Sequence, residues 1–478
     1  MNIVSPIFVL FFLSFIFLFN LRSSIGWKRA VSIVANLIFL ASFAQQPLNL
    51  IPIVLFLVYC YACIEIVRRG VKLPIFVAIL VSTLLVFVSL KQYSFVPTPL
   101  ELAFPYVTIG LSYILFRVVH MLIDMRSGDI AGPVRPIAFF NYTCNFLTLI
   151  SGPIQRFQDF QAQTEAAPKP LTDEVVRSAL GRIIKGFVNV AALSAIANYL
   201  FTNRQEALFA GDSVGLKAAI EYMITAVCYT FYLYSNFAGY MDIVIGIGKL
   251  TGQDLPENFN KPFKSRNFLE FWSRWHITLS NWFRLYLFNP LLRLMMTHIT
   301  DRRLEPYLGV VAFFITFLVM GVWHGPTAIF VVYGCIMGAG VSLNKLWQVV
   351  MTKRLGRKGY KALSDNPVYE YLCVGMTFGF YVMAITCLWV DLPQFMSILK
   401  ALGVGGVLFS FTVLTAAGAV VAAAWETLAK QTQGAAAKVS DVMAHPLVNS
   451  FALSAQILLV VATMSFFHKA PEFVYRAF

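Results

Sequence analysis

Residues 73–90 read LPIFVAILVSTLLVFVSL, a stretch without a charged side chain. As an α-helix this stretch would rise about 27 Å, which is close to the hydrocarbon thickness of a bilayer. Similar apolar runs lie near 4–21, 30–46, 50–66, 104–123, 178–200, 218–248, 307–323, 327–348, 368–390, 403–425 and 451–467. The pattern predicts an all-α polytopic membrane protein with about 11–12 transmembrane helices, forming a single domain over residues 1–478. Because neither a basic segment nor a small-residue cleavage site flanks the run from Ile3 to Leu21, we interpret this run as a retained span and not a cleaved signal.

The composition indicates that lipid is the main solvent of this chain. Hydrophobic residues make up 58% of the sequence and charged residues 13%, whereas a soluble domain carries about 25% charged residues. The formal net charge is +14. Because the basic residues lie in short loops between apolar runs, we attribute this charge to orientation in the membrane and predict no nucleic-acid partner.

The basic residues favour alternate loops. They gather in the first loop (Arg22, Lys28 and Arg29), the third (Arg68, Arg69 and Lys72) and the fifth (Arg126 and Arg135). The positive-inside rule then places these loops in the cytoplasm and the N-terminus outside.

Whether the run 137–151 crosses the membrane determines on which side of the membrane the basic stretch 249–303 lies. A crossing at 137–151 would place that stretch outside, whereas a segment that dips in and returns keeps it cytoplasmic. The run is short, contains Asn141 and Asn145, and ends at SGP (151–153). Since irregular backbone is tolerated at membrane depth where protein buries it, we predict a re-entrant segment.

The seven cysteines form no recognisable disulfide framework. Cys60 and Cys63 make a C-x-x-C motif, but no second pair of ligands accompanies it. We interpret both as small apolar residues of a buried helix and predict no metal site.

The segment 255–292 combines polar and aromatic residues inside a hydrophobic chain. Apolar side chains recur there at helical spacing: Phe268, Phe271, Trp272, Trp275, Leu279, Trp282, Phe283 and Tyr286. They predict an amphipathic helix at or just inside the membrane interface, with His276 at the boundary of its aromatic face. This pattern fits a structural interfacial helix as well as a functional site.

The sequence GVWHGP (321–326) interrupts two apolar runs. Gly and Pro break a helix there and free backbone polar groups. An ionisable residue such as His324 inside a membrane segment is a functional hypothesis by default. A histidine that bonds a freed carbonyl at a helix end is the structural alternative, and the pattern leaves both open.

Taken together, these segments resemble the membrane-bound O-acyltransferase family, and in particular its bacterial alginate O-acetyltransferase-like branch. The resemblance extends from about residue 100 to 350 and includes the C-terminus. The similar segments are SGPIQRF (151–157), YSNFAGYMD (234–242), LPENFNKPF (255–263), RWHITLSNWFRLYLF (274–288), GVWHG (321–325) and PEFVYRAF (471–478).

The resemblance implies catalytic roles for two histidines. His324 matches the essential histidine of the family, and His276 matches its second position in the R-W-H segment. It also implies a ring of tilted helices around a central tunnel, in which a donor from the cytoplasm meets an acceptor from the other side. Many relatives have Asp where this chain has Leu285, which puts an ionic role of that position in doubt.

An imidazole suits the implied reaction. A hydroxyl is a weak nucleophile at neutral pH, and a neutral imidazole can take its proton during attack on a thioester carbonyl. We therefore predict His324 as the general base. His276 either orients the acceptor, hydrogen-bonds the thioester or supports the cavity. The expected donor is an acyl thioester such as acetyl-coenzyme A, with no bound cofactor.

Further residues are candidates for substrate binding. They are Trp323, Arg274, Trp275, Ser280 and Asn281 near the histidines, together with Arg156 and Asp242. Arg156 is placed to meet the phosphates of a coenzyme A thioester, although positive-inside charge also accounts for it. Asp242 either lines the central cavity or forms an ion pair within the protein.

The resemblance implies transfer of an acyl group, foremost acetyl, to an exported polysaccharide at the bacterial inner membrane, with a periplasmic partner acyltransferase. D-alanyl transfer towards teichoic acid is the alternative within the family. A transporter or flippase without acyl chemistry is the alternative from another class. Transporters often have paired inverted repeats with broken helices, and the sequence shows no matching halves.

Overall fold

The fold is described from a computed structural model over residues 5–44, 46–97, 106–167, 170–210 and 214–467. The regular elements in these ranges are helices, and the extended pairing among them is limited to one bridge between Phe259 and Trp275. The all-α prediction is therefore confirmed.

The chain divides into two compact units. The first comprises the described residues up to Ala191 together with Asn236–Glu257. The second comprises Ala192–Ser235 together with the described residues from Asn258 onward. The single membrane-embedded domain stays a prediction.

Within the described ranges, eight helices are long and apolar enough to cross a membrane. They are Pro47–Arg68, Leu73–Lys91, Asp173–Phe209, Glu305–His324, Ile329–Ser364, Pro367–Leu388, Leu392–Thr432 and Val448–Phe466. The prediction of a polytopic membrane protein is confirmed, with fewer long apolar helices than the about 11–12 expected from apolar runs.

Three of the expected runs form helices of 17 residues or fewer. α1 (Pro6–Asn20) has 15 residues and α2 (Ile25–Ala41) has 17. The run near 104–123 yields α5 (Leu111–Ser127), whose side chains are nearly all buried in protein. Because hydropathy reports only that a run avoids water, it does not distinguish a helix buried in protein from one that faces lipid.

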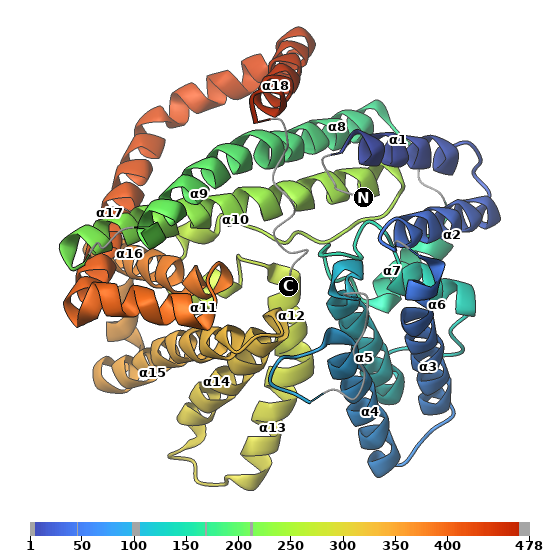
Figure 1. Cartoon of the computed structure of the whole chain (residues 1–478), viewed down its shortest axis with the longest axis horizontal. Coiled ribbons are helices and arrows are strands. Elements are labelled where there is room, and N and C mark those ends of the chain that lie inside the picture. Colours follow the sequence, from blue (N-terminus) through green and yellow to red (C-terminus); the bar gives the residue numbers. More distant parts are fainter. Residues whose placement is uncertain (1–4, 45, 98–105, 168–169, 211–213, 468–478) are drawn as a thin grey trace. The chain divides into compact units, whose positions relative to one another are not determined.

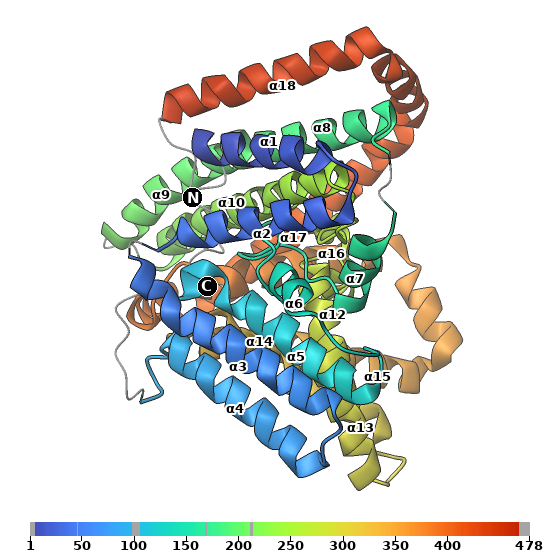
Figure 2. The ribbon, with the colours of Figure 1, turned by 90° about the vertical axis from the view of Figure 1, so that its right-hand side faces the viewer.

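In the first unit, α3 (Ile51–Arg68), α4 (Leu73–Lys91) and α5 pack against one another (Figure 1). Figure 2 shows α1 alongside α2, and the rings of Phe11 and Phe39 stack between them with centroids 6.1 Å apart. Aromatic packing of this kind holds the two N-terminal helices together.

A buried arginine holds the irregular segment that follows α6 (Pro136–Thr143). The Arg117 guanidinium donates to the carbonyl oxygens of Tyr142 at 3.1 Å and Thr143 at 2.6 Å. It also donates to the Thr148 carbonyl oxygen at 2.6 Å. α6 has eight residues, about 12 Å, and is too short to cross the membrane. The predicted re-entrant segment thus forms no spanning helix, and a guanidinium satisfies the carbonyl groups that lipid would leave unbonded.

Four helices come next along the chain, and they belong partly to the first unit and partly to the second. They are α7 (Phe157–Glu165), α8 (Asp173–Phe187), α9 (Ser194–Ala210) and α10 (Leu216–Leu250), with α9 and the first part of α10 assigned to the second unit. α8 crosses the second half of α10 closely at Gly186. A Cβ atom on Gly186 would lie 2.7 Å from the Gly239 carbonyl oxygen, so a larger residue would force the helices apart.

From Asn258 onward, the described part of the second unit adds three short helices and five long ones. They are α11 (Phe268–Trp272), α12 (Ile277–Phe283), α13 (Asn289–His298), α14 (Glu305–His324), α15 (Ile329–Ser364), α16 (Pro367–Ala384), α17 (Leu392–Ala444) and α18 (Pro446–Phe467). α14 packs along α15, and α16 packs along α17 (Figure 1). Gly356 (φ 70°) and Gly403 (φ 60°) bend α15 and α17, because glycine adopts positive φ without a steric penalty.

Candidate active site

His324 is the last residue of α14, where the chain turns back into α15. The glycines around it permit a tight helical hairpin. A Cβ atom on Gly321 would lie 2.2 Å from the Gly334 Cα atom, and one on Gly325 would lie 2.0 Å from the Phe330 ring. The GVWHG motif therefore brings the two helices into contact and leaves His324 at the helix end, as predicted from the break.

The His324 ring is buried among aromatic side chains. It is 2% exposed, its centroid lies 5.3 Å from that of Tyr333 in an edge-on contact, and it lies 4.9 Å from that of Trp323. Trp323 in turn contacts Phe283 of α12 at 6.5 Å. The end of α14 therefore packs beside the R-W-H segment.

The R-W-H segment is not the continuous amphipathic helix that its periodicity predicts. α11 ends at Trp272, a turn follows, and α12 begins at Ile277. At this break His276 adopts φ 45° and ψ 52°, the left-handed region. The prediction of one helix was wrong because a distant loop pairs with this segment. The Asn260 N–H donates to the Arg274 carbonyl oxygen at 2.9 Å, which takes backbone groups out of the helical ladder.

Most of the aromatic side chains of this segment are buried in protein, whereas Trp282 and Tyr286 are half-buried. Trp275 is 2% exposed. Its ring lies 5.0 Å from Phe259 at an interplanar angle of 85°, 5.7 Å from Phe271 in a stacked contact, and 5.1 Å from Tyr381 of α16. Trp275 thus supports the position of the neighbouring His276, and no open substrate surface is formed by its ring.

His276 is fully buried and lies close to His324. Its Nδ1 atom is 3.4 Å from the Asn258 carboxamide oxygen. Burial, and secondarily the electrostatic effect of His324, hold the pKa of His276 well below its ordinary value. The structure therefore brings the two predicted catalytic histidines together and favours the neutral form of His276 at physiological pH.

Residues 126–384, just over half of the chain, match the sequence model of MBOAT, the membrane-bound O-acyltransferase family. The chain belongs to this family. Both histidines lie inside the matched range.

Curated relatives of this MBOAT chain carry two different names. The teichoic acid D-alanyltransferase of Streptococcus thermophilus is 32% identical over 57% of this chain and 65% of its own length. That of Bacillus subtilis is 28% identical over 58% of this chain and 68% of its own length. The probable alginate O-acetylase AlgI of Pseudomonas aeruginosa is 30% identical over 53% of this chain and 45% of its own length. This chain thus spans about half to two thirds of these relatives, and their similar identities do not resolve the branch.

Three of the predicted substrate-binding residues lie near His276 in the sequence. Arg274 pairs with Glu270 at 2.7 Å. The Ser280 hydroxyl donates to the Trp275 carbonyl oxygen at 3.4 Å, and Asn281 is exposed on α12. These side-chain contacts of Arg274 and Ser280 stay within this segment. The roles of all three residues in substrate binding therefore stay predictions.

Arg156 lies in the first unit within a network of its own. Its guanidinium contacts the Asp124 carboxylate at 2.7 Å. The same carboxylate accepts from Gln158 at 2.7 Å and lies 3.0 Å from His120 Nδ1. This network joins the start of α7 to the end of α5. The arginine side chain is 45% exposed, so its contact with a phosphate group remains a prediction.

Asp242 forms internal ion pairs, one of the two alternatives that the sequence left open. Its carboxylate lies 3.0 Å from both Arg182 Nε and Lys185 Nζ of α8. Arg182 also donates to the Glu257 carboxylate, and this bond is the main cause that lowers the pKa of Glu257. Sequence analysis missed Arg182 and Glu257, because ion pairs between distant segments leave no local pattern.

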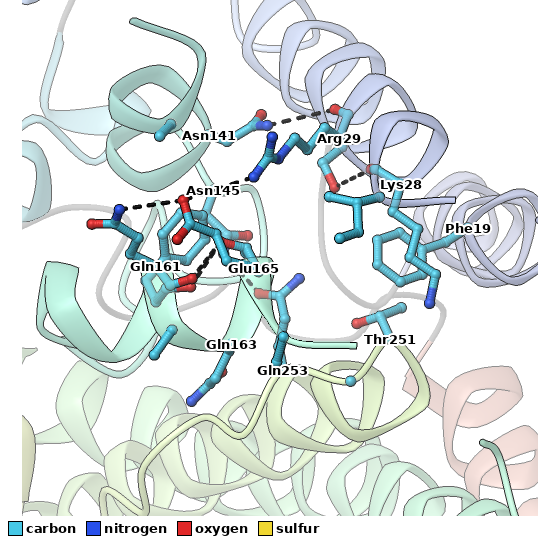
Figure 3. A pocket seen from close by; sticks show the side chains of 18 of the residues that line it. Phe19, Lys28, Arg29, Asn141, Asn145, Gln161, Gln163, Glu165, Thr251 and Gln253 are labelled. Atoms are coloured by element: carbon cyan, nitrogen blue, oxygen red, sulfur yellow. Dashed lines mark hydrogen bonds and ion pairs between the residues drawn. The ribbon is translucent and has the colours of Figure 1, made fainter. Parts of the chain in front are cut away.

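A cavity of about 1500 Å³ lies in the first unit between α1, α2, α6, α7 and α8. Figure 3 shows its polar wall, where Arg29 approaches Glu165 at 3.9 Å and Asn145 donates to Gln253 at 3.0 Å. None of the predicted catalytic or substrate-binding residues lines this cavity.

Among the described residues, no group of three or more His, Cys, Asp and Glu side chains is arranged to hold a metal ion. The PEFVYRAF segment (471–478), one of the segments that resembles the family, lies outside the described residues.

Proposed function

We propose that this MBOAT chain is an O-acyltransferase that moves an acyl group from a cytoplasmic thioester across the membrane, for O-acylation of an exported polysaccharide. The main support is the juxtaposition of His276 and His324, two buried imidazoles in a multi-pass membrane protein of an acyltransferase family. His276 and His324 each lie at the end of a helix. Two buried histidines in such positions are typical of a catalytic site and unusual for a purely structural core.

The proposed chemistry needs one general base. The acceptor hydroxyl attacks the thioester carbonyl, and His324 takes the hydroxyl proton as the new C–O bond forms. The C–S bond then breaks, and the leaving thiolate takes that proton from the imidazolium. A positioned base of this kind contributes about 10²–10⁴-fold to the rate.

Access to the histidines requires movement. His276 is 0% and His324 is 2% exposed, so substrates reach them only after the surrounding aromatic side chains shift. A site that is closed at rest would protect the thioester from hydrolysis by water. The central tunnel implied by the family is the route that we propose for both substrates.

The first candidate reaction uses acetyl-coenzyme A and a polysaccharide acceptor, with a periplasmic partner acyltransferase completing the transfer at the bacterial inner membrane. D-alanyl transfer towards teichoic acid is the second candidate. It is favoured by the relatives with that name, of which this chain aligns with 65% and 68%, against 45% of the acetylase AlgI.

Mass analysis of surface polymers tests the proposal and distinguishes the candidates. Cells that carry His324→Ala should lose the acyl ester while the protein persists in membranes. His298→Ala, an exposed histidine at the end of α13, is the matched control and should retain the ester. An acetyl ester on polysaccharide supports the first candidate, and a D-alanyl ester on teichoic acid supports the second. Normal ester content with His324→Ala would refute the assignment of the base.

A further inference from the structure

Asn258 contacts the turn around His276 with both its backbone and its side chain. It is fully buried in the loop that follows α10. Its carbonyl oxygen accepts the Ile277 N–H at 3.0 Å. Its carboxamide oxygen accepts the Thr278 N–H at 3.0 Å and the Thr278 hydroxyl at 2.9 Å. The first turn of α12 is thus held at two points by one residue.

This attachment has a conformational consequence for His276. A bulky residue with φ 45° lies in a region that L-amino acids rarely adopt, and such a conformation persists only where the surroundings enforce it. The two residues that follow His276 are the ones whose N–H groups Asn258 binds. Asn258 therefore supplies a large part of the constraint that keeps this backbone left-handed.

The same contacts favour one tautomer of the His276 ring. A backbone N–H can only donate, so the Asn258 side chain presents its oxygen, and not its NH₂ group, to Thr278. That oxygen also lies 3.4 Å from His276 Nδ1. An amide oxygen can only accept, so this contact is a hydrogen bond when Nδ1 bears the hydrogen of the neutral ring and Nε2 carries the lone pair.

We propose that Asn258 is the positioning residue of His276, which holds the imidazole as its Nδ1–H tautomer and orients the ring for acyl transfer. The inference rests on the proposed function, because it assigns His276 a part in that reaction. It also accounts for the LPENFNKPF segment, which sequence comparison singles out without giving it a role.

The charged and titratable groups around this turn make a specific test possible. His324 of α14 is near enough to act electrostatically on His276. Tyr234 of α10 and Tyr381 of α16 pack on the adjacent Trp275, and Arg274 is paired with Glu270. In this arrangement Asn258→Asp places a carboxylate where the neutral amide oxygen lies near Nδ1.

The expected effect of Asn258→Asp has a definite sign. A carboxylate at this distance favours the imidazolium and raises the pKa of His276 by about 1–3 pH units. The neutral imidazole of His276 is then reached only at higher pH, so the acid limb of the rate–pH profile should move upward. Asp retains the oxygen that accepts from Thr278, so the fold should persist.

The experiment measures acetyl transfer from acetyl-coenzyme A by the full-length protein in vesicles across a pH series. Asn258→Ala should lower kcat about 10²-fold, the loss expected when a catalytic group is misplaced by about 1 Å. Asn258→Asp should shift the acid limb, and His276→Gln combined with it should abolish that shift. Asn260→Asp, which adds the same charge on an exposed residue of the same loop, should leave the profile unchanged.

The outcomes separate this proposal from the proposed function. Wild-type profiles for both Asn258 variants, with His324→Ala inactive, would overturn the positioning role and leave the acyltransferase intact. Wild-type protein that transfers no more acetyl or D-alanyl than His324→Ala would remove the enzyme, and with it the role of Asn258. If Asn258→Ala is absent from membranes, Asn258→Asp alone decides.

Discussion

Two buried histidines of this protein differ in the group that lies beside Nδ1, which is a carboxylate for His120 and a neutral amide for His276. In the first unit, His120 Nδ1 lies 3.0 Å from the Asp124 carboxylate, and its Nε2 accepts the Phe157 N–H at 2.8 Å. In the second unit, His276 Nδ1 lies 3.4 Å from the amide oxygen of Asn258. Both rings are at most 2% exposed, so burial alone does not distinguish them.

The difference shows how a structural histidine can be separated from a candidate catalytic one. Both nitrogens of His120 make short bonds to groups that the fold needs, so the ring joins α5 to α7. His276 has a longer contact with a neutral amide, a left-handed backbone and a second imidazole nearby. Partners and backbone conformation, more than burial, therefore indicate which ring takes part in chemistry.

The largest effect, on the rate of acyl transfer, is expected for replacement of His324. His324→Ala should lower acyl transfer about 10²–10⁴-fold, because the proposed general base is removed. The protein level in membranes and the melting temperature should change little, since alanine leaves no charged group buried. Transfer rates with acetyl-coenzyme A or a D-alanyl thioester, normalised to folded protein, check this. A parallel loss of folded protein would indicate that His324 is structural in the way His120 is.

The next largest effect concerns Arg117, a buried residue that supports the fold of the first unit. Arg117→Met should destabilise the first unit by at least about 3 kcal/mol, because three buried carbonyl groups that accept from Arg117 lose their donor. Thermal unfolding in detergent measures this effect. Arg126→Met, at an exposed arginine of the same helix, serves as the control and should change stability far less.

His120→Ala should have a smaller effect of the same kind. It leaves the Phe157 N–H and the Asp124 carboxylate without their histidine partner, which costs about 1–3 kcal/mol. The rate of acyl transfer per folded molecule should stay at the wild-type value. A drop in rate without a drop in melting temperature would contradict the assignment of His120 to structure.

The smallest effect is expected at Arg156. Its side chain is 45% exposed, so Arg156→Gln should cost only about 0–1 kcal/mol in stability. The Michaelis constant for acetyl-coenzyme A tests the predicted phosphate contact separately. An unchanged constant would assign Arg156 to its pairing with Asp124 alone.

Local signals were sufficient for the membrane class and for the position of His324 at a helix end. Long apolar runs reflect solvent preference directly, and Gly and Pro beside His324 mark a helix end wherever they occur. The aromatic periodicity of 268–286 failed as a guide to one continuous helix, because the chain leaves the helical conformation at His276.

Composition and hydropathy were enough to predict a helical membrane protein, and the motifs were enough to single out His276 and His324. These signals can be read from the sequence because each depends on residues that are close together along the chain. Folding added the partners: the Arg182 pairing of Asp242, the Phe157 N–H bond to His120 and the Asn258 contact with His276. Each of these joins residues that are neighbours in space through packing of separate segments. The residue pattern of one helix or loop does not predict which other segment will pack against that helix or loop.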